Sequence, residues 1–381
     1  MSALVGPSRV PPPARPGDPL DAVDTPALAV ELGALERNVA RMAREAAAAG
    51  VRLRPHAKTH KCSAIARLQV AAGAVGLCCQ KVGEAEVLVA GGIEDVLVTN
   101  EIVRPSKLTR LATLAKHARI GLCVDAVEAA TAASDAAQAA GTTLGVLVEI
   151  DVGQGRCGAA PGSEAVALAA QVSAQPGLRF DGLQAYHGAA QHFRTARERN
   201  DAIARAAELT RETADALAAA GLPCPVIGGA GTGTYPIEAT TRLWTEIQPG
   251  SYVFMDADYA ANETEAPYEH ALFVLAGVMS RREGHGVVDA GLKALSGESG
   301  LPLLWGVEGG RLTGLSDEHA TLALPAADPA ADPALGETVR LIPSHCDPTV
   351  NLHDWIVAFR DGPDGPSVEH VWPVDARGAV F

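Results

Sequence analysis

Short apolar runs alternate with segments of helical character along residues 25–258. The predicted strands are residues 26–31, 51–54, 75–79, 95–100, 120–124, 144–151, 180–186 and 225–228. The predicted helices are residues 35–49, 63–72, 83–90, 106–117, 127–140, 163–174 and 194–220. About eight strands that alternate with helices indicate an α/β protein, built either as a closed (β/α)8 barrel or as an open doubly wound sheet.

The polar segments of this region favour the barrel. They follow many different strands, whereas an open sheet would gather its ligand-binding loops at one switch point. These segments are His56–Lys58, Gln80–Lys81, Asn100–Glu101, Gly153–Gly158, His187–His192 and Gly228–Tyr235. Because a barrel brings all of its strand ends to one face, we expect one site there.

The pattern changes towards the C-terminus. Residues 270–381 carry short apolar runs separated by Gly, Pro and Asp, a pattern that predicts an antiparallel β domain. We therefore predict a Pro- and Gly-rich N-terminal arm over residues 1–24, the barrel over 25–258 and the β domain over 259–381. The Ala/Asp/Pro-rich stretch 325–333 is predicted to be a surface loop.

Composition narrows the possible partners and the compartment. The net charge of −14 argues against nucleic acid and anionic membranes, because both attract clustered Lys and Arg. We find no apolar run of membrane-spanning length and no N-terminal signal pattern. Seven scattered cysteines without a CxxC pair are typical of reduced thiols in a cytoplasmic protein.

Lys58 lies where a predicted strand ends and a helix begins. A neutral lysine amine is a nucleophile towards aldehydes, and cationic neighbours such as His56 and His60, or desolvation, can lower its pKa. A solvated basic turn is the alternative interpretation.

Two glycine-rich loops are candidates for anion binding. Gly228–Thr234 has four glycines in six residues, so its backbone can approach a phosphate closely, as in many barrels after the seventh and eighth strands. Arg156, in Asp151–Gly158, can lie against a planar anionic group. A flexible turn and an exposed turn arginine are the alternatives.

Histidines occur in two further segments. Tyr186, His187 and His192 follow the seventh predicted strand, where a histidine is a candidate acid or base. In Ser344–Thr349, an extended chain would place His345 and Asp347 on one face and Cys346 on the other. A histidine and a carboxylate on one face are a partial divalent-cation site, to which Asp317 could add a ligand. A solvated turn is the alternative there.

Together, these segments resemble the D-threonine aldolase / D-serine dehydratase family, pyridoxal-phosphate enzymes of the alanine racemase fold type. The segments that carry the resemblance are Arg54–Lys61, Cys79–Glu86, Val148–Gly158, Gln184–His192, Gly228–Tyr235, Gln248–Tyr259, Asp289–Lys293 and His345–Thr349. They occur in the expected order across residues 20–381. The resemblance implies a barrel followed by a β domain, and a homodimer.

The resemblance also implies roles for individual residues. It places the Schiff base of pyridoxal 5'-phosphate on Lys58 and turns Arg156 towards the ring hydroxyl of the cofactor. It assigns a divalent cation to His345 and Asp347, with manganese or magnesium expected and zinc as an alternative. The other cofactor-binding residues that it implies are Tyr186, Gly229, Gly231, Thr232, Gly233 and Thr234.

The activity implied is retro-aldol cleavage of a D-β-hydroxy-α-amino acid of the D-threonine or 3-hydroxy-D-aspartate type. His192 would take the hydroxyl proton, and the products would be glycine and an aldehyde. The alternative is a dehydratase, in which a base such as Lys58 removes the Cα proton to give a 2-oxo acid and ammonia.

At the position of the metal pair, the pattern of the eukaryotic D-serine dehydratases is His-x-Cys. This chain has His345-x-Asp347, as bacterial hydroxyaspartate enzymes also do, and we favour the aldolase. A pyridoxal-phosphate-binding protein without enzymatic activity would leave the β domain and the metal pair unexplained. A metal-dependent barrel hydrolase would leave Lys58 and the glycine loop unexplained.

Overall fold

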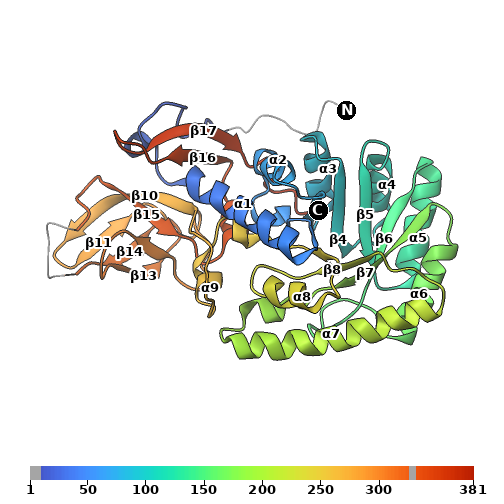
Figure 1. The fold of residues 1–381 in the computed structure, drawn as a ribbon. Helices are drawn as coiled ribbons and strands as arrows, with labels where there is room; N and C mark the ends of the chain where they lie inside the picture. Colours follow the sequence, from blue (N-terminus) through green and yellow to red (C-terminus); the bar gives the residue numbers. More distant parts are fainter. Residues whose placement is uncertain (1–9, 326–331) are drawn as a thin grey trace.

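The computed structural model describes residues 10–325 and 332–381, which form two parts that lie side by side (Figure 1). In the first part, eight parallel strands run in the order β2-β9-β8-β7-β6-β5-β4-β3. Their bounds are β2 (Arg52–Leu53), β3 (Leu77–Cys79), β4 (Asp95–Glu101), β5 (Arg119–Val124), β6 (Leu144–Glu149), β7 (Leu178–Ala185), β8 (Val226–Gly229) and β9 (Glu246–Ile247). Cys78 N donates to Pro55 O at 2.8 Å and Val75 N to Leu53 O at 2.9 Å, so the two ends of the sheet meet and the predicted barrel is confirmed.

Helices cover the outside of these strands. They are α2 (Ser63–Ala71), α3 (Val82–Ala90), α4 (Pro105–Leu114), α5 (Val127–Ala140), α6 (Ser163–Ala174), α7 (Ala196–Ala219) and α8 (Tyr235–Thr241). In α5 the buried face consists of small side chains at helical spacing, among them Ala129, Ala133 and Ala137. Helices α5 and α6 have the predicted bounds, because strong helix formers fill them and Gly141 ends α5 in the left-handed conformation.

The second part is a nine-stranded sheet, in which β13-β14-β11-β10-β1-β16-β17 are successive neighbours and β15 pairs with β10 and β12. Its strands are β1 (Ala27–Glu31), β10 (Leu272–Arg282), β11 (His285–Val288), β12 (Leu303–Trp305), β13 (Arg311–Leu315), β14 (Ala320–Ala323), β15 (Thr338–Ile342), β16 (Trp355–Arg360) and β17 (Ser367–Pro373). All of its pairs are antiparallel except that of β1 with β16. The predicted β domain is therefore confirmed.

One predicted barrel strand belongs to this second sheet. Strand β1 pairs with β10 through Ala27 and Leu275, and with β16 through Ala29 and Val357. Residues 27–31 are thus outside the barrel, contrary to the predicted start of that domain at residue 25. A short apolar run has the same pattern in either kind of sheet, which is why the sequence misplaced it. The eighth barrel strand is β9, whose two residues give no periodic signal.

Helix α1 (Leu32–Ala49) follows β1 and lies at the junction of the two parts (Figure 1). Its buried residues include Leu32, Leu35, Val39 and Met42, which recur every three to four positions and face one side. Two short helices, α9 (Ala257–Ala260) and α10 (Cys346–Val350), were not predicted.

The predicted N-terminal arm is described from residue 10 onwards. There it follows β17, since Gly17 N donates to Val368 O at 2.8 Å and Val368 N to Asp18 O at 2.9 Å. Residues 1–9 of the arm and 326–331 of the predicted surface loop lie outside the described residues. Among the helices of the described ranges, none is long and apolar enough to cross a bilayer.

Candidate active site

A cavity of about 280 Å³ lies at the carboxyl ends of the barrel strands. Most of the strand ends contribute residues to it, as the barrel topology favours. The predicted site residues that line it are Lys58, Arg156, Tyr186, His192, Gly231 and Thr232. A second cavity of about 400 Å³ shares Thr232 and Tyr259 with the first, but Lys58 is not among its lining residues. The chemistry therefore belongs to the smaller cavity.

Lys58 lies in a 3-10 turn, Ala57–Thr59, that follows β2. Its Nζ is 3.0 Å from Asp347 Oδ2, and its side chain is 40% exposed to the cavity. The charge of Asp347 raises the pKa of Lys58 above its usual value, although burial opposes this shift. A lysine from the barrel and an aspartate from the second part of the molecule thus meet in one ion pair.

The two histidines that flank Lys58 do not act as cationic neighbours. Burial lowers the pKa of His60 to about 4 and that of His56 well below its usual value, so both rings are neutral near pH 7. His60 Nε2 contacts Gln69 Oε1 at 3.2 Å, and His56 Nδ1 accepts from Lys58 N at 3.3 Å. The expectation that these histidines lower the pKa of Lys58 by their charge was wrong, since the barrel wall desolvates both rings.

His345 and Asp347 lie together at the start of α10. His345 Nε2 is 3.9 Å from Asp347 Oδ2, and Asp347 Oδ1 is buried without a hydrogen-bond partner among the described residues. Burial opposes ionisation of Asp347, yet the charges of Lys58 and His345 hold its pKa below the usual range. Only His345 is extended, and the helix begins at Cys346, whose side chain is buried. The expected shared face therefore arises from a helix start and not from a strand.

Asp317 is not brought to this pair. It is exposed between β13 and β14, where its carbonyl accepts from Lys293 N at 3.0 Å. No contact joins it to His345 or Asp347 in the part of the chain that the structure describes.

The glycine loop after β8 contributes to the cavity in two places. Gly231 and Thr232 line it, and a Cβ on Gly231 would lie 2.4 Å from Gln191 Oε1. Gly233 N donates to the same Gln191 oxygen at 3.0 Å. The loop thus forms a close backbone cradle around Gln191 that has no room for side chains.

Two of the predicted cofactor-binding residues lie behind this cradle. The fully buried Thr234 hydroxyl accepts from Gln191 Nε2 at 2.7 Å and donates to Glu238 Oε1 at 2.8 Å. Gly229 is in β8 at a φ of +152°, with its missing Cβ directed at Ala185 O. Neither residue is among those that line the cavity.

His192 ends a 3-10 turn, Ala189–His192, that follows β7. Its Nδ1 is 2.5 Å from Asp258 Oδ2, and its side chain is 47% exposed. His187 is buried, its Nδ1 accepts from Ala190 N, and it is not a cavity-lining residue. Of the two histidines in this segment, His192 is thus the one placed to exchange a proton with a ligand.

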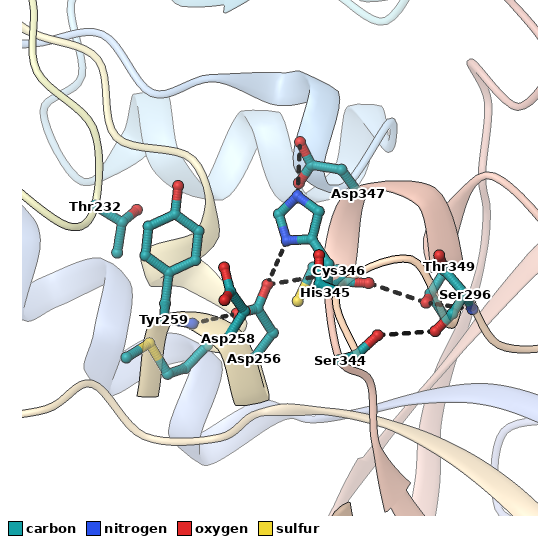
Figure 2. A network of polar contacts seen from close by, with 12 residues as sticks. Thr232, Asp256, Asp258, Tyr259, Ser296, Ser344, His345, Cys346, Asp347 and Thr349 are labelled. Carbon is teal, nitrogen blue, oxygen red and sulfur yellow. Dashed lines mark hydrogen bonds and ion pairs between the residues drawn. The ribbon is translucent and has the colours of Figure 1, made fainter. Parts of the chain in front are cut away.

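Sequence reasoning assigned no role to three further residues of the site. Asp256 contacts His345 (Figure 2), Asp258 contacts His192, and Tyr259 lines the cavity beside both histidine rings. The available signal was a pair of carboxylates in the apolar run Tyr252–Tyr259, because buried carboxylates require partners.

Two carboxylates and a thiol come together near the carboxyl ends of β4, β5 and β6. The ligand atoms of Glu101, Asp125 and Cys157 lie within 4.8 Å of one another. Burial, together with the charge of Glu101, raises the pKa of the nearby Glu149 to about 8. Glu149 therefore carries a proton near pH 7, although it lines the cavity.

These residues fit both groups that the sequence implies. A lysine amine reaches into a cavity that is also lined by Gly231 and Thr232 of a glycine-rich loop, which suits a phosphate-bearing aldehyde. An unpartnered buried carboxylate oxygen beside an imidazole nitrogen suits a divalent cation.

Comparison with known proteins agrees with this geometry. Residues 30–258 match the family described as alanine racemase, N-terminal domain. The chain belongs to this family. Residues 271–359 match the putative serine dehydratase domain. The resemblance inferred from the motifs is thus confirmed.

Individual relatives are similar over nearly the whole chain. The D-threonine aldolase of an Arthrobacter species is 47% identical over 373 residues, which cover 97% of each chain. The 3-hydroxy-D-aspartate aldolase of Paracoccus denitrificans (strain Pd 1222) is 44% identical over 379 residues, 97% of this chain and 96% of the relative. The crystal structure of D-threonine aldolase from Filomicrobium marinum superposes with a TM-score of 0.94 at 51% identity, over 98% of this chain and 100% of that one.

A dehydratase is a more distant relative. The D-threo-3-hydroxyaspartate dehydratase of Delftia sp. (strain HT23) is 33% identical over 354 residues, which cover 86% of this chain and 92% of the relative.

Proposed function

We propose that this protein is a pyridoxal-phosphate- and divalent-metal-dependent aldolase that cleaves D-β-hydroxy-α-amino acids to glycine and an aldehyde. One observation carries the proposal: Lys58 of the barrel and Asp347 of the β domain meet at 3.0 Å beside His345. The amine that lines the cavity is thus paired directly with one member of the proposed metal-ligand pair. The similarity to the two aldolases supports this choice of reaction.

The barrel side of the cavity would hold the cofactor. Lys58 Nζ is the group that would bind it covalently, with Gly231 and Thr232 at its phosphate and Arg156 and Tyr186 at its ring. When bound, pyridoxal phosphate supplies an electron sink for the carbanion that bond cleavage leaves at Cα.

The β-domain side would hold the cation between His345 Nε2 and Asp347. When bound, a divalent cation lowers the pKa of a hydroxyl group that coordinates it. Because Asp258 occupies His192 Nδ1, the free Nε2 is the atom that accepts the β-hydroxyl proton of the substrate. The Cα–Cβ bond then breaks, Cβ becomes the aldehyde carbon, and Cα keeps its own hydrogen and gains a proton.

The second candidate is a dehydratase that gives a 2-oxo acid and ammonia. It is favoured by the proximity of the Lys58 amine to the proposed metal pair, since the amine could remove the Cα proton. The more distant similarity to the Delftia enzyme ranks this reaction below the aldolase.

A product assay separates the two reactions. Purified protein with pyridoxal phosphate and Mn²⁺ is incubated separately with D-threonine and with each diastereomer of D-3-hydroxyaspartate. The aldolase yields glycine and an equal amount of acetaldehyde or glyoxylate. Formation of ammonia and a 2-oxo acid without glycine would show that the protein is a dehydratase and not an aldolase. The choice of manganese, the homodimer and the cytoplasmic location stay predictions.

A further inference from the structure

His192, which lines the cavity, and His345, whose ring centroid is 6.4 Å from that of His192, are both held by carboxylates from one short segment. His345 Nδ1 lies 2.8 Å from Asp256 Oδ2, and His192 Nδ1 lies 2.5 Å from Asp258 Oδ2. Asp256 is the N-cap of α9, and Asp258 lies within that helix. The two histidines come from different parts of the molecule, His192 from the barrel and His345 from the β domain.

Asp256 is fully buried and is held on both of its oxygens (Figure 2). Its Oδ1 accepts from Tyr259 N at 2.9 Å, and its Oδ2 accepts from Cys346 N at 3.0 Å in addition to the His345 ring. Asp347 and Asp256 lie on opposite sides of the His345 ring, so the ring is fixed between them. The side chain that carries Nε2 thus has one orientation.

Asp258 is also fixed by several contacts. Its Oδ1 pairs with the Arg194 guanidinium, which also donates through Nη1 to Asp258 O at 2.6 Å. Asp258 N donates to Ser344 O at 3.0 Å, one residue before His345. The segment is therefore bonded to the loop of each histidine that it contacts.

When it is neutral, an imidazole that donates Nδ1–H to a carboxylate has its unprotonated nitrogen at Nε2. In His345 that nitrogen faces Asp347, where a cation would bind, and His192 lines the cavity. We propose that Asp256 and Asp258 are positioning residues, Asp256 for the metal ligand His345 and Asp258 for the proton acceptor His192. This inference rests on the proposed function and assigns a separate task to each aspartate.

If the two aspartates have separate tasks, two isosteric variants should differ in whether kcat or Mn²⁺ affinity falls. An asparagine can direct its N–H groups at Nδ1 and so favour the tautomer with the proton on Nε2. Asp258→Asn should lower kcat about 10²-fold through the misplaced base, with KM and the Mn²⁺ dissociation constant unchanged. Asp256→Asn should raise the Mn²⁺ dissociation constant about 10–100-fold, as loss of a partner behind a metal ligand does. Arg197→Ala, at a side chain that is 91% exposed beside the same loop, is the control and should behave as the wild type.

A double variant tests whether Asp258 acts through His192. If it does, adding Asp258→Asn to His192→Ala should cause no further loss of kcat. A second loss of the same size would overturn the proposal, because Asp258 would then act independently of the ring. Equal losses of kcat and of Mn²⁺ affinity in both single variants would also overturn it, since the segment would then be only a structural element.

A spectroscopic readout makes the test independent of turnover. In the holoenzyme loaded with diamagnetic Mg²⁺ and labelled with ¹⁵N-histidine, the His192 signals are assigned by their loss in His192→Ala. Wild-type His192 should show a protonated Nδ1 and an unprotonated Nε2, and Asp258→Asn should reverse this pattern. An unchanged tautomer would contradict the positioning role. If the wild type forms no glycine from any substrate, the proposed function fails while this measurement still decides the inference.

Discussion

The two sides of the candidate site are built in different ways. On the barrel side, Lys58, Arg156 and Gly231 each follow a different strand, so the repeated βα topology places them. On the β-domain side, His345 and Asp347 come from a single turn after β15. The barrel topology as a whole therefore positions the barrel side. The metal side is positioned by side-chain and backbone contacts around one turn.

Those local contacts are a chain of uncharged hydrogen bonds. Thr349 Oγ1 donates to His345 O at 2.9 Å and accepts from Ser296 N at 3.1 Å (Figure 2). Ser344 Oγ donates to Ser296 O at 2.8 Å. Since these groups are buried or partly buried, losing one leaves its partner without a bond. We therefore expect the metal side to respond to small substitutions that the barrel side tolerates.

The largest effect is expected on the barrel side. Lys58→Ala should remove the visible absorbance of the bound cofactor and abolish turnover, because Lys58 is the only lysine among the described residues that line the cavity. Absorbance spectra and glycine formation measure both. Lys116→Ala, at an exposed lysine after α4, is the control and should retain both signals. A variant at Lys58 that still turns over would refute the assignment of the cofactor site.

The matching change on the metal side should separate the two halves. His345→Ala combined with Asp347→Ala should leave cofactor absorbance in place while kcat falls about 10³-fold, since Lewis-acid stabilisation is worth several kcal/mol. Titration with Mn²⁺ should show no site. Asp317→Ala is the control, because that exposed side chain is apart from the pair. Full activity in the presence of a chelator would contradict the metal assignment.

Removal of a single hydroxyl group should weaken metal binding without affecting cofactor binding. Thr349→Val removes the bridge between His345 O and Ser296 N, at a cost of about 1–3 kcal/mol for the buried groups left unpaired. We expect weaker Mn²⁺ binding and unchanged cofactor absorbance. Thr210→Val is the matched control, since Thr210 is equally buried and donates to Ala206 O within α7. Equal Mn²⁺ affinities in the two variants would show that the Thr349 hydroxyl does not support the metal side.

The last prediction concerns the pH dependence of stability on the barrel side. Burial raises the pKa of Glu149 to about 8, while an unfolded glutamate titrates near about 4.3. The folded state thus keeps a proton that the unfolded state loses, so this stability is fully present below about pH 4.3 and is lost as pH rises through about 8.

Glu149→Gln cannot ionise and should flatten this slope. Relative to the wild type, the variant should gain on the order of a few kcal/mol between pH 5 and pH 9 in denaturant unfolding. Glu94→Gln, at an exposed glutamate, is the control. Parallel pH profiles for Glu149→Gln and the wild type would show that the burial of Glu149 does not matter for stability.

The barrel was predictable because its signal is repeated. Helices α5 and α6 have the bounds that alternation and glycine stops indicate. Strand β1 was misplaced because a run buried on both faces carries no information about its partners, and β9 was missed because two residues have no period.

The placement of single residues at strand ends was predictable, as for Lys58, which lines the cavity. Sequence alone could not find the tasks of Asp256 and Asp258, because their partners are 89 and 66 residues away along the chain. Nor could it show that the Thr234 hydroxyl is taken up by Gln191 and Glu238. Each of these facts depends on tertiary contacts that local patterns do not record.

The most direct test of the central claim follows the hydrogen on Cα. D-Threonine that carries deuterium at Cα is incubated in ordinary water with the protein, pyridoxal phosphate and Mn²⁺, and the initial products are analysed by mass spectrometry. Cleavage of the Cα–Cβ bond leaves that deuterium untouched, so we predict glycine with one deuterium and an equal amount of acetaldehyde. Release of the deuterium to water with formation of 2-oxobutanoate and ammonia would contradict the account.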